Sequence, residues 1–358
     1  MTRSISARVF WVSLFVALLA VQTACNGSAS NPTPASTAAE AHTAPLPTAV
    51  VTPTTEPTIS DRATPIASAT QTPIPGPFAA FTGSEQLSAM KQRLEQTAVS
   101  YTRTLALDIG RRQSGTLEEA KAAEYLKKEF QSFGYVTTIQ EFQTQLRGRG
   151  GTLIPLSSRN VVAVKPGASV SSPMLILGGH FDTVETSTGA NDNGSGTAVL
   201  LAIAKELAKA NLGYEIRFVA FGSEEVGLIG SREFIRSLSD ENKARIQGML
   251  NFDALAGGDT SILIGSPELV RTASIISRLA GINTRESEEP PNSTSDHFNF
   301  QREGISVLYF GGDDYSKIHT PQDTMENITP RLIGEAAVIG YLMTRQLISP
   351  QPLSNPGV

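Results

Sequence analysis

The sequence has little of several residue types, and each shortage excludes a class of chemistry. Cys25 is the only cysteine in 358 residues and lies near the N-terminus. The rest of the chain therefore has no disulfide, thiol nucleophile or iron–sulfur site. No basic cluster offsets the formal net charge of −5, which argues against nucleic acid as a partner. Histidine is also scarce, with four in the chain, so the places where histidines occur are informative.

Residues 1–24 have the features of a signal peptide. Arg3 and Arg8 precede an apolar run of about thirteen residues, whereas a membrane span needs about 20. The run is followed by VQTAC, which ends in Cys25 and resembles a bacterial lipobox, although its glutamine stands where an aliphatic residue is usual. We predict an exported protein, a cell-surface or periplasmic lipoprotein whose only membrane contact is an N-terminal lipid anchor. Ordinary secretion is the alternative.

Residues 25–80 are dominated by Pro, Thr, Ser and Ala. Such a segment has too few large apolar side chains to offset the entropy of ordering, so we predict a disordered tether in which His42 is inert. A folded domain is predicted for residues 82–349, followed by a flexible tail at residues 350–358. No second linker interrupts the domain, which therefore counts as one.

The folded part alternates between helical and strand patterns. Capping boxes at Thr82 and Thr116 predict two helix starts. The short β-rich runs that follow are VTTIQEFQ, NVVAV, MLILGG, EIRFVAF, MLNFD, SILIG and ISVLYF. Helix-like segments occupy residues 195–207, 228–238, 267–279 and 330–347. The alternation predicts an α/β fold, a single domain with a largely parallel, mixed central sheet flanked by helices.

Carboxylates and histidines follow the ends of the predicted strands. LIL leads into GGHFD, RFVAF into GSEE, MLNF into Asp253, and VLYF into GGDDYSKIHT. Ligands of such sheets gather at the carboxyl ends of the strands, so these segments are expected to meet. All three histidines of the folded part, His180, His297 and His319, lie in carboxylate-rich segments.

So many acidic groups around one cleft would destabilise the fold unless cations compensate them. The carboxylates concerned are Asp182, Asp192, Glu224, Glu225, Asp253 and Asp296. Nitrogen and oxygen ligands without sulfur suit Zn²⁺, with Mn²⁺ or Co²⁺ as possible substitutes. Two histidines and three carboxylates, one of them bridging, would give each of two ions three protein ligands. One of the adjacent glutamates can then bind metal while the other accepts a proton from water.

The motifs HFDT, GANDNGSG, SEEVGLIGS, NFDA, SDHFNF and IHTPQDT occur in this order. Together they resemble the M28 family of dizinc metallopeptidases, and the similarity runs from about Gln113 to Leu347. The resemblance implies two Zn²⁺ per chain, one held by His180, Asp192 and Asp253. It implies that Asp192 bridges to a second zinc.

The resemblance also assigns the remaining site residues. Glu225 and His319 complete the second zinc site, Glu224 is the general base, and Asp182 orients His180. SDHFNF matches a motif that lines the substrate pocket, which implies that Asp296 and His297 are pocket or supporting residues.

One position departs from the family pattern. Many relatives have an aromatic residue, often tyrosine, before the last histidine, and its hydroxyl stabilises the oxyanion, whereas this sequence has Ile318. Losing one such donor can cost roughly 3 kcal/mol. Tyr315 is a candidate to replace it from the same loop; otherwise the zinc pair must polarise the carbonyl.

The function that we favour from the sequence is a dizinc aminopeptidase acting on peptide or protein N-termini. A carboxypeptidase and a one-zinc, glutaminyl-cyclase-like acyltransferase are alternatives within the superfamily. A catalytically dead binding domain is the alternative of another class, but such proteins usually lose ligands, and all five are present here.

Overall fold

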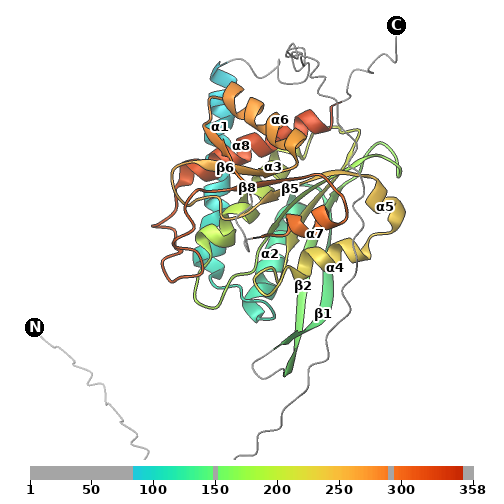
Figure 1. The fold of residues 1–358 in the computed structure, drawn as a ribbon, viewed down its shortest axis with the longest axis vertical. Helices are drawn as coiled ribbons and strands as arrows, with labels where there is room; N and C mark the ends of the chain where they lie inside the picture. The colour runs from blue at the N-terminus through green and yellow to red at the C-terminus, as the bar shows by residue number, and fades with distance from the viewer. Residues whose placement is uncertain (1–83, 148–151, 289–293, 350–358) are drawn as a thin grey trace, which may run out of the picture. The chain divides into compact units, whose positions relative to one another are not determined.

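The computed structural model describes residues 84–147, 152–288 and 294–349 (Figure 1). Within them, eight strands form one mixed sheet in the order β1-β2-β4-β3-β5-β8-β6-β7. The strands are β1 (Val136–Arg147), β2 (Leu153–Lys165), β3 (Met174–His180), β4 (Glu215–Phe221), β5 (Ile246–Phe252), β6 (Ser261–Gly265), β7 (Thr284–Glu286) and β8 (Val307–Gly311).

The central strands β4, β3, β5 and β8 run parallel to one another. The flanking strands β2 and β6 pair antiparallel with β4 and β8. Every residue of β3 is buried, as expected of a parallel strand covered on both faces. The predicted fold class, α/β with a largely parallel, mixed sheet between helices, is confirmed. Because parallel strands end at the same edge, the loops that follow these four strands converge.

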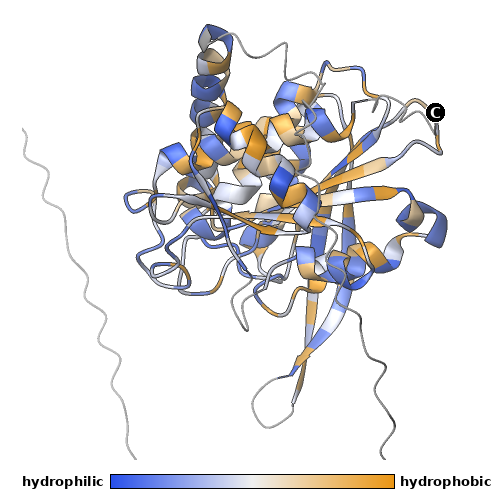
Figure 2. Ribbon diagram, turned by 45° about the horizontal axis from the view of Figure 1, so that its top comes forward, coloured by the Kyte–Doolittle hydropathy of each residue, from blue (hydrophilic) through white to orange (hydrophobic). Residues whose placement is uncertain are grey.

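Helices cover both faces of the sheet. One face carries α1 (Ser84–Arg103), α2 (Leu117–Ser132), α3 (Gly196–Leu207), α6 (Pro267–Leu279) and α8 (Pro330–Leu347), whose apolar residues share a core cluster with the strands. On the other face, α4 (Ile229–Ser237) and α7 (His297–Arg302) pack around Phe221, Phe234 and Phe300. The shorter elements are η2 (Thr104–Ile109), η4 (Ala190–Ser195) and α5 (Asp240–Ala244). Figure 2 shows hydrophobic residues concentrated on the central strands and hydrophilic ones on the outer turns and loops.

Element bounds follow the sequence signals where these were strong. α6 and α8 have the predicted bounds, and α3 and α4 differ by single residues at their ends. The hydroxyl of Thr116 accepts the N–H of Glu119, which confirms the predicted cap of α2. The elements β7, α5 and α7 were not predicted, because they are too short to show a period in the sequence. β2 was predicted to begin at Asn160, whereas it starts at Leu153 in an exposed, partly polar stretch.

Several predictions concern parts of the chain outside the described residues. The leader (residues 1–24), the tether (residues 25–80), the tail (residues 350–358) and the cap at Thr82 all lie there. Among the helices that the structure does describe, none combines the length and the hydropathy needed to cross a bilayer.

Candidate metal centre

The parallel strands bring the predicted ligands to one edge of the sheet. His180 ends β3, and Asp253 directly follows β5. The remaining residues lie in loops at the same edge: Glu224 and Glu225 after β4, His319 after β8, and Asp192 in η4 between β3 and α3. These six side chains from distant parts of the sequence therefore meet because the strands that they follow are parallel.

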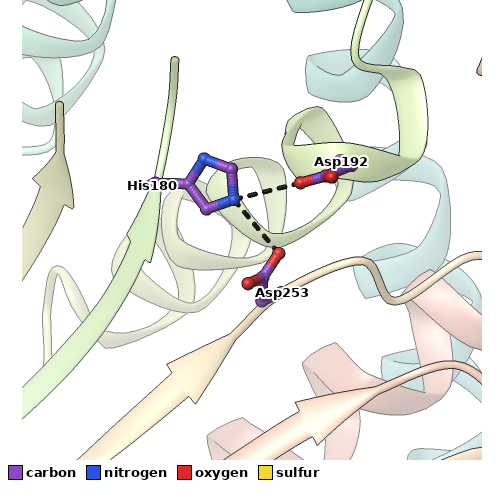
Figure 3. Close-up of side chains that lie close together, drawn as sticks. All are labelled: His180, Asp192 and Asp253. Atoms are coloured by element: carbon purple, nitrogen blue, oxygen red, sulfur yellow. Dashed lines mark hydrogen bonds and ion pairs between the residues drawn. The ribbon is translucent and has the colours of Figure 1, made fainter. Parts of the chain in front are cut away.

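The first group of ligand atoms is buried. The Nε2 atom of His180 lies 3.1 Å from Oδ1 of Asp192 and 3.2 Å from Oδ1 of Asp253 (Figure 3). The side chain of His180 is 1% exposed, and those of the two aspartates are also buried or nearly so. The three side chains converge on one point between β3, β5 and η4.

The second group shares Asp192 with the first but opens to solvent. The Nε2 atom of His319 lies 3.0 Å from Oδ2 of Asp192 and 3.0 Å from Oε2 of Glu225. The side chain of His319 is 54% exposed. Asp192 directs one carboxylate oxygen to each group, so its carboxylate lies between the two.

The donor atoms of both groups fit divalent cations. In each group, one nitrogen or oxygen from each of three residues lies within 4.8 Å of the others. Oε1 of Glu225 is buried and has no hydrogen-bond partner within the described residues, which is costly unless a cation or water satisfies it. Nitrogen and oxygen donors without sulfur suit Zn²⁺ or a similar ion. The residues therefore fit a pair of cations that share Asp192.

Asp182 ties His180 to the loop that carries both glutamates. The Nδ1 atom of His180 lies 3.2 Å from the carbonyl oxygen of Asp182 and 3.5 Å from its Oδ1. The carboxylate of Asp182 also accepts the N–H groups of Glu224 at 3.1 Å and Glu225 at 3.4 Å, and the hydroxyl of Ser114 at 2.8 Å. One fully buried carboxylate thus contacts the ring of His180 and fixes the backbone of the next loop.

Burial and charge crowding shift the pKa values of the centre. Burial raises the pKa of Glu224 well above its usual value, and the charge of Asp253 adds to the shift. Hydrogen bonds to Asp192 and Glu225 raise the pKa of His319 to about 10. Burial acts to lower the pKa of His180, but the charges of Asp253 and Glu224 raise it well above its usual value. These carboxylates need positive charge, which either protons or metal ions can supply.

Three non-glycine residues at the centre adopt left-handed backbone angles. The angle φ is 58° at Ser223 and at His319, and 49° at Ala254. Ser223 directly precedes Glu224, and Ala254 directly follows Asp253. Such a conformation costs on the order of 1–3 kcal/mol at a non-glycine residue and is concentrated at functional sites. The local backbone therefore supports a functional role for this edge of the sheet.

A cavity of about 420 Å³ adjoins both groups. Beyond four of the ligands and Glu224, its walls are formed by Ala254, Ile264, Thr294, Ser295, His297, Tyr309, Tyr315 and Ile318. Neither lysine nor arginine occurs among these described lining residues. The described lining is therefore partly apolar, with carboxylates and histidines at the candidate metal centre.

The predicted substrate residues are placed differently relative to this cavity. His297 and Tyr315 line it, whereas Asp296 is fully buried outside the lining, and burial raises its pKa to about 7. The hydroxyl of Tyr315 lies 3.3 Å from that of Tyr309, which donates to the carbonyl oxygen of Asp253 at 3.2 Å. Tyr315 therefore reaches the cavity through a hydroxyl that already has a partner.

Comparison with known proteins identifies the family. The model for peptidase family M28 matches residues 160–342, about half of the chain. This chain belongs to peptidase family M28. The matched span contains all five predicted ligands and Glu224, so the family assignment rests on the part of the chain that forms the centre.

Curated relatives are similar to this M28 chain over part of their length. Leupeptin-inactivating enzyme 1 of Streptomyces exfoliatus is 32% identical, over 58% of this chain and 46% of its own. Aminopeptidase YwaD of Bacillus subtilis is 32% identical, over 50% of this chain and 42% of its own. The probable lipoprotein aminopeptidase LpqL of Mycobacterium tuberculosis is 33% identical, over 50% of this chain and 41% of its own. The chain thus spans less than half the length of these relatives.

Solved structures share the fold. The zinc aminopeptidase BSAP of Bacillus subtilis superposes with a TM-score of 0.65 at 18% identity, covering 72% of this chain and 95% of its own. A glutaminyl cyclase of Fimbriiglobus ruber superposes with a TM-score of 0.60 at 22% identity, covering 70% of this chain and 95% of its own. Both activities are therefore found on this fold.

Two buried charged residues beside the centre were not among the predicted site residues. Arg112 lies in the stretch RRQSGT and Asp323 in IHTPQDT, and both are buried. The only sequence signal for Asp323 was its place in the motif IHTPQDT, which also contains His319. Nothing in the pattern around Arg112 distinguishes it from the solvent-exposed arginine beside it.

Proposed function

We propose that this chain is a dizinc aminopeptidase that removes N-terminal residues from peptides. The observation that carries the proposal is the pair of ligand groups that share Asp192, beside a cavity with no lysine or arginine among its described lining residues. Relatives named as aminopeptidases support the reaction class over the part of their length that the chain matches.

The proposed ion sites follow the two groups. His180, Asp192 and Asp253 would hold the first Zn²⁺, and Asp192 would share the second with Glu225 and His319. When bound, the ions polarise the scissile carbonyl and make a water molecule more acidic. Mn²⁺ or Co²⁺ is expected to replace Zn²⁺ in the same ligand set.

Glu224 is the proposed general base. It lines the cavity beside the ligands, and its backbone N–H is held by Asp182. In the proposed reaction its carboxylate accepts a proton from the attacking water and returns that proton to the amine that leaves. Two divalent ions nearby would favour its ionised form, against the burial that raises its pKa. His297 and Tyr315, which also line the cavity, are proposed to contact the substrate, and Asp296 to support them.

The charge of the cavity favours an aminopeptidase over a carboxypeptidase. A carboxypeptidase must hold the carboxylate at the end of its substrate, which usually requires an arginine or another cation. The described lining offers no lysine or arginine for that role. The complete second ligand group favours two ions over the one-ion cyclase alternative.

Hydrolysis of matched peptides tests this proposal. The purified protein is given a panel of free-amine peptides, their N-acetylated counterparts and a peptide with N-terminal glutamine, with and without a chelator. We expect cleavage of free-amine peptides alone, abolished by chelation and restored by Zn²⁺. Release of C-terminal residues, or cyclisation of the glutamine without hydrolysis, would replace the proposal with one of its alternatives.

We also propose export and lipid anchoring through Cys25. The lipobox-like sequence and the relative named as a lipoprotein aminopeptidase support this. Labelling with a radioactive fatty acid should mark the wild-type chain but not the Cys25→Ala variant. Equal labelling of both chains would rule out this anchor.

A further inference from the structure

Arg112 holds the segment between the ligands His180 and Asp192 from one side. It is fully buried. Its guanidinium donates to the carbonyl oxygens of Phe181 at 2.7 Å and Gly189 at 3.0 Å, close to the two ends of the segment. Burial lowers the pKa of Arg112 to about 10, so it stays positively charged at neutral pH. One buried cation therefore holds the chain between His180 and Asp192 on this side.

Asp323 holds the same segment from the other side. It is 2% exposed. Its Oδ1 accepts the N–H of Asn191 at 2.6 Å, and its Oδ2 accepts the N–H of Asp192 at 3.1 Å and the hydroxyl of Ser187 at 3.2 Å. Both carboxylate oxygens of Asp323 thus accept backbone N–H groups at or next to Asp192, the residue that the two groups share.

The loop that carries His319 is attached to this network. The hydroxyl of Thr186 donates to the carbonyl oxygen of His319 at 2.9 Å, and that of Thr188 donates to the carbonyl oxygen of Asp323 at 2.9 Å. Asp323 also closes a turn of the same loop by donating its N–H to the carbonyl oxygen of Thr320 at 3.2 Å. The placement of Asp192 and that of His319 are therefore coupled through Asp323.

We infer that Asp323 is a positioning residue that sets the affinity of the exposed ligand group for its ion. Two of the three members of that group, Asp192 and His319, are held by its network. In the buried group, only Asp192 is held by this network. The other two members, His180 and Asp253, lie at the ends of strands. The inference rests on the proposed dizinc function and predicts that losing Asp323 weakens the two ions unequally.

The test is a calorimetric titration of Zn²⁺ into metal-free protein. Asp323→Asn keeps the size of the side chain but places an amide NH₂ against backbone N–H donors, so at least one of its bonds is lost. We expect the affinity for the second ion to fall by roughly 10–100-fold, the range found for outer partners of metal ligands. The affinity for the first ion should change by less than about threefold. A general structural defect would instead weaken the binding of both ions.

Glu215→Gln is the matched control. Glu215 is also a buried carboxylate with two partners, Arg217 at 2.6 Å and Arg245 at 2.5 Å. It lies at the start of β4, whereas the ligand groups lie at the carboxyl ends of the parallel strands. This variant should lower the melting temperature and leave both zinc affinities unchanged. Ser187→Ala removes one hydrogen-bond donor to Asp323. It should also weaken binding of the second ion selectively, but by less. This variant serves as the test if Asp323→Asn does not fold.

Three results would overturn the inference: wild-type affinities in the variants at Asp323 and Ser187, equal weakening of both ions, or a selective loss in Glu215→Gln as well. If the wild-type chain itself binds fewer than two ions, the proposed dizinc function fails first. The titration of the wild type therefore separates the two failures.

Discussion

The two ligand groups differ in how the fold places them. The buried group takes His180 and Asp253 from the ends of the neighbouring parallel strands β3 and β5, and the side chain of His180 is 1% exposed. The exposed group takes Glu225 and His319 from loops, and the side chain of His319 is 54% exposed. Sites built on strands are held more firmly than sites built on loops. We expect the first group to bind its ion more tightly and to exchange it more slowly.

The shared carboxylate allows the largest test of this comparison. Asp192→Ala removes a ligand from both groups and should lose both ions, with activity reduced by at least about a thousandfold. Zinc content by elemental analysis and the hydrolysis rate check this prediction. Asp240→Ala, in the exposed helix α5, is the control that should retain both. Normal zinc content in Asp192→Ala would show that the groups do not share this residue.

A substitution at Glu224 tests the proposed proton transfer separately from metal binding. Glu224→Gln should keep two ions and the melting temperature, because the side chain belongs to neither ligand group. Its hydrolysis rate should fall by about 10²–10⁴-fold, the contribution of a general base. A fully active variant would remove Glu224 from the mechanism.

Loss of one histidine at a time tests the asymmetry directly. His319→Ala should retain one ion and remain folded, because the side chain is half exposed. His180→Ala opens space in a buried site and should lower the melting temperature as well as removing an ion. In both variants the affected ion should bind at least about a hundredfold more weakly, beyond the usual effect of outer partners. Equal melting temperatures would contradict the difference in burial.

Metal affinity should rise with pH at the exposed group. Hydrogen bonds to Asp192 and Glu225 raise the pKa of His319 to about 10, so at neutral pH the free imidazole carries a proton that the metal must displace. Lowering the pH therefore weakens binding, by about tenfold per pH unit for each proton released. Titrations between pH 6 and 8 in buffers of different ionisation enthalpy measure both quantities. A pH-independent affinity would contradict this assignment of charge.

The smallest expected effect concerns Tyr315. Its hydroxyl already contacts that of Tyr309, so it is poorly placed to act as the sole oxyanion donor. Tyr315→Phe should lower kcat by only a few fold, the contribution of one ordinary hydrogen bond of about 1 kcal/mol. A loss near that of a full oxyanion donor, roughly a hundredfold or more, would instead make Tyr315 the replacement for the hydroxyl missing at Ile318.

The parts of the molecule that the sequence predicted are those with strong local signals. The alternation of β-rich runs and helical periods predicted the parallel sheet, and the position of His180 and Asp253 at strand ends predicted that they meet. Short elements such as β7 and α5 were missed because three to five residues show no period. α7, which begins with His297 in the cavity lining, was missed for the same reason, but none of the five predicted ligands lies in these short elements.

The support behind the ligands could not be predicted in the same way. Arg112 is surrounded by polar residues in the sequence, yet five carbonyl oxygens accept hydrogen bonds from its buried guanidinium. That burial arises only when residues 105–110 and 181–189 come together in the fold. Spacing along the chain carries no information about such contacts, so tertiary structure was needed to find both Arg112 and Asp323.

Anomalous diffraction at the zinc edge, from crystals of metal-replete protein, tests the central claim most directly. The account predicts two peaks about 3.5–4 Å apart, as in known two-metal sites. Each should lie about 2 Å from a different carboxylate oxygen of Asp192, with His180 at one peak and His319 at the other. A single peak, or two peaks that do not share Asp192, would contradict it.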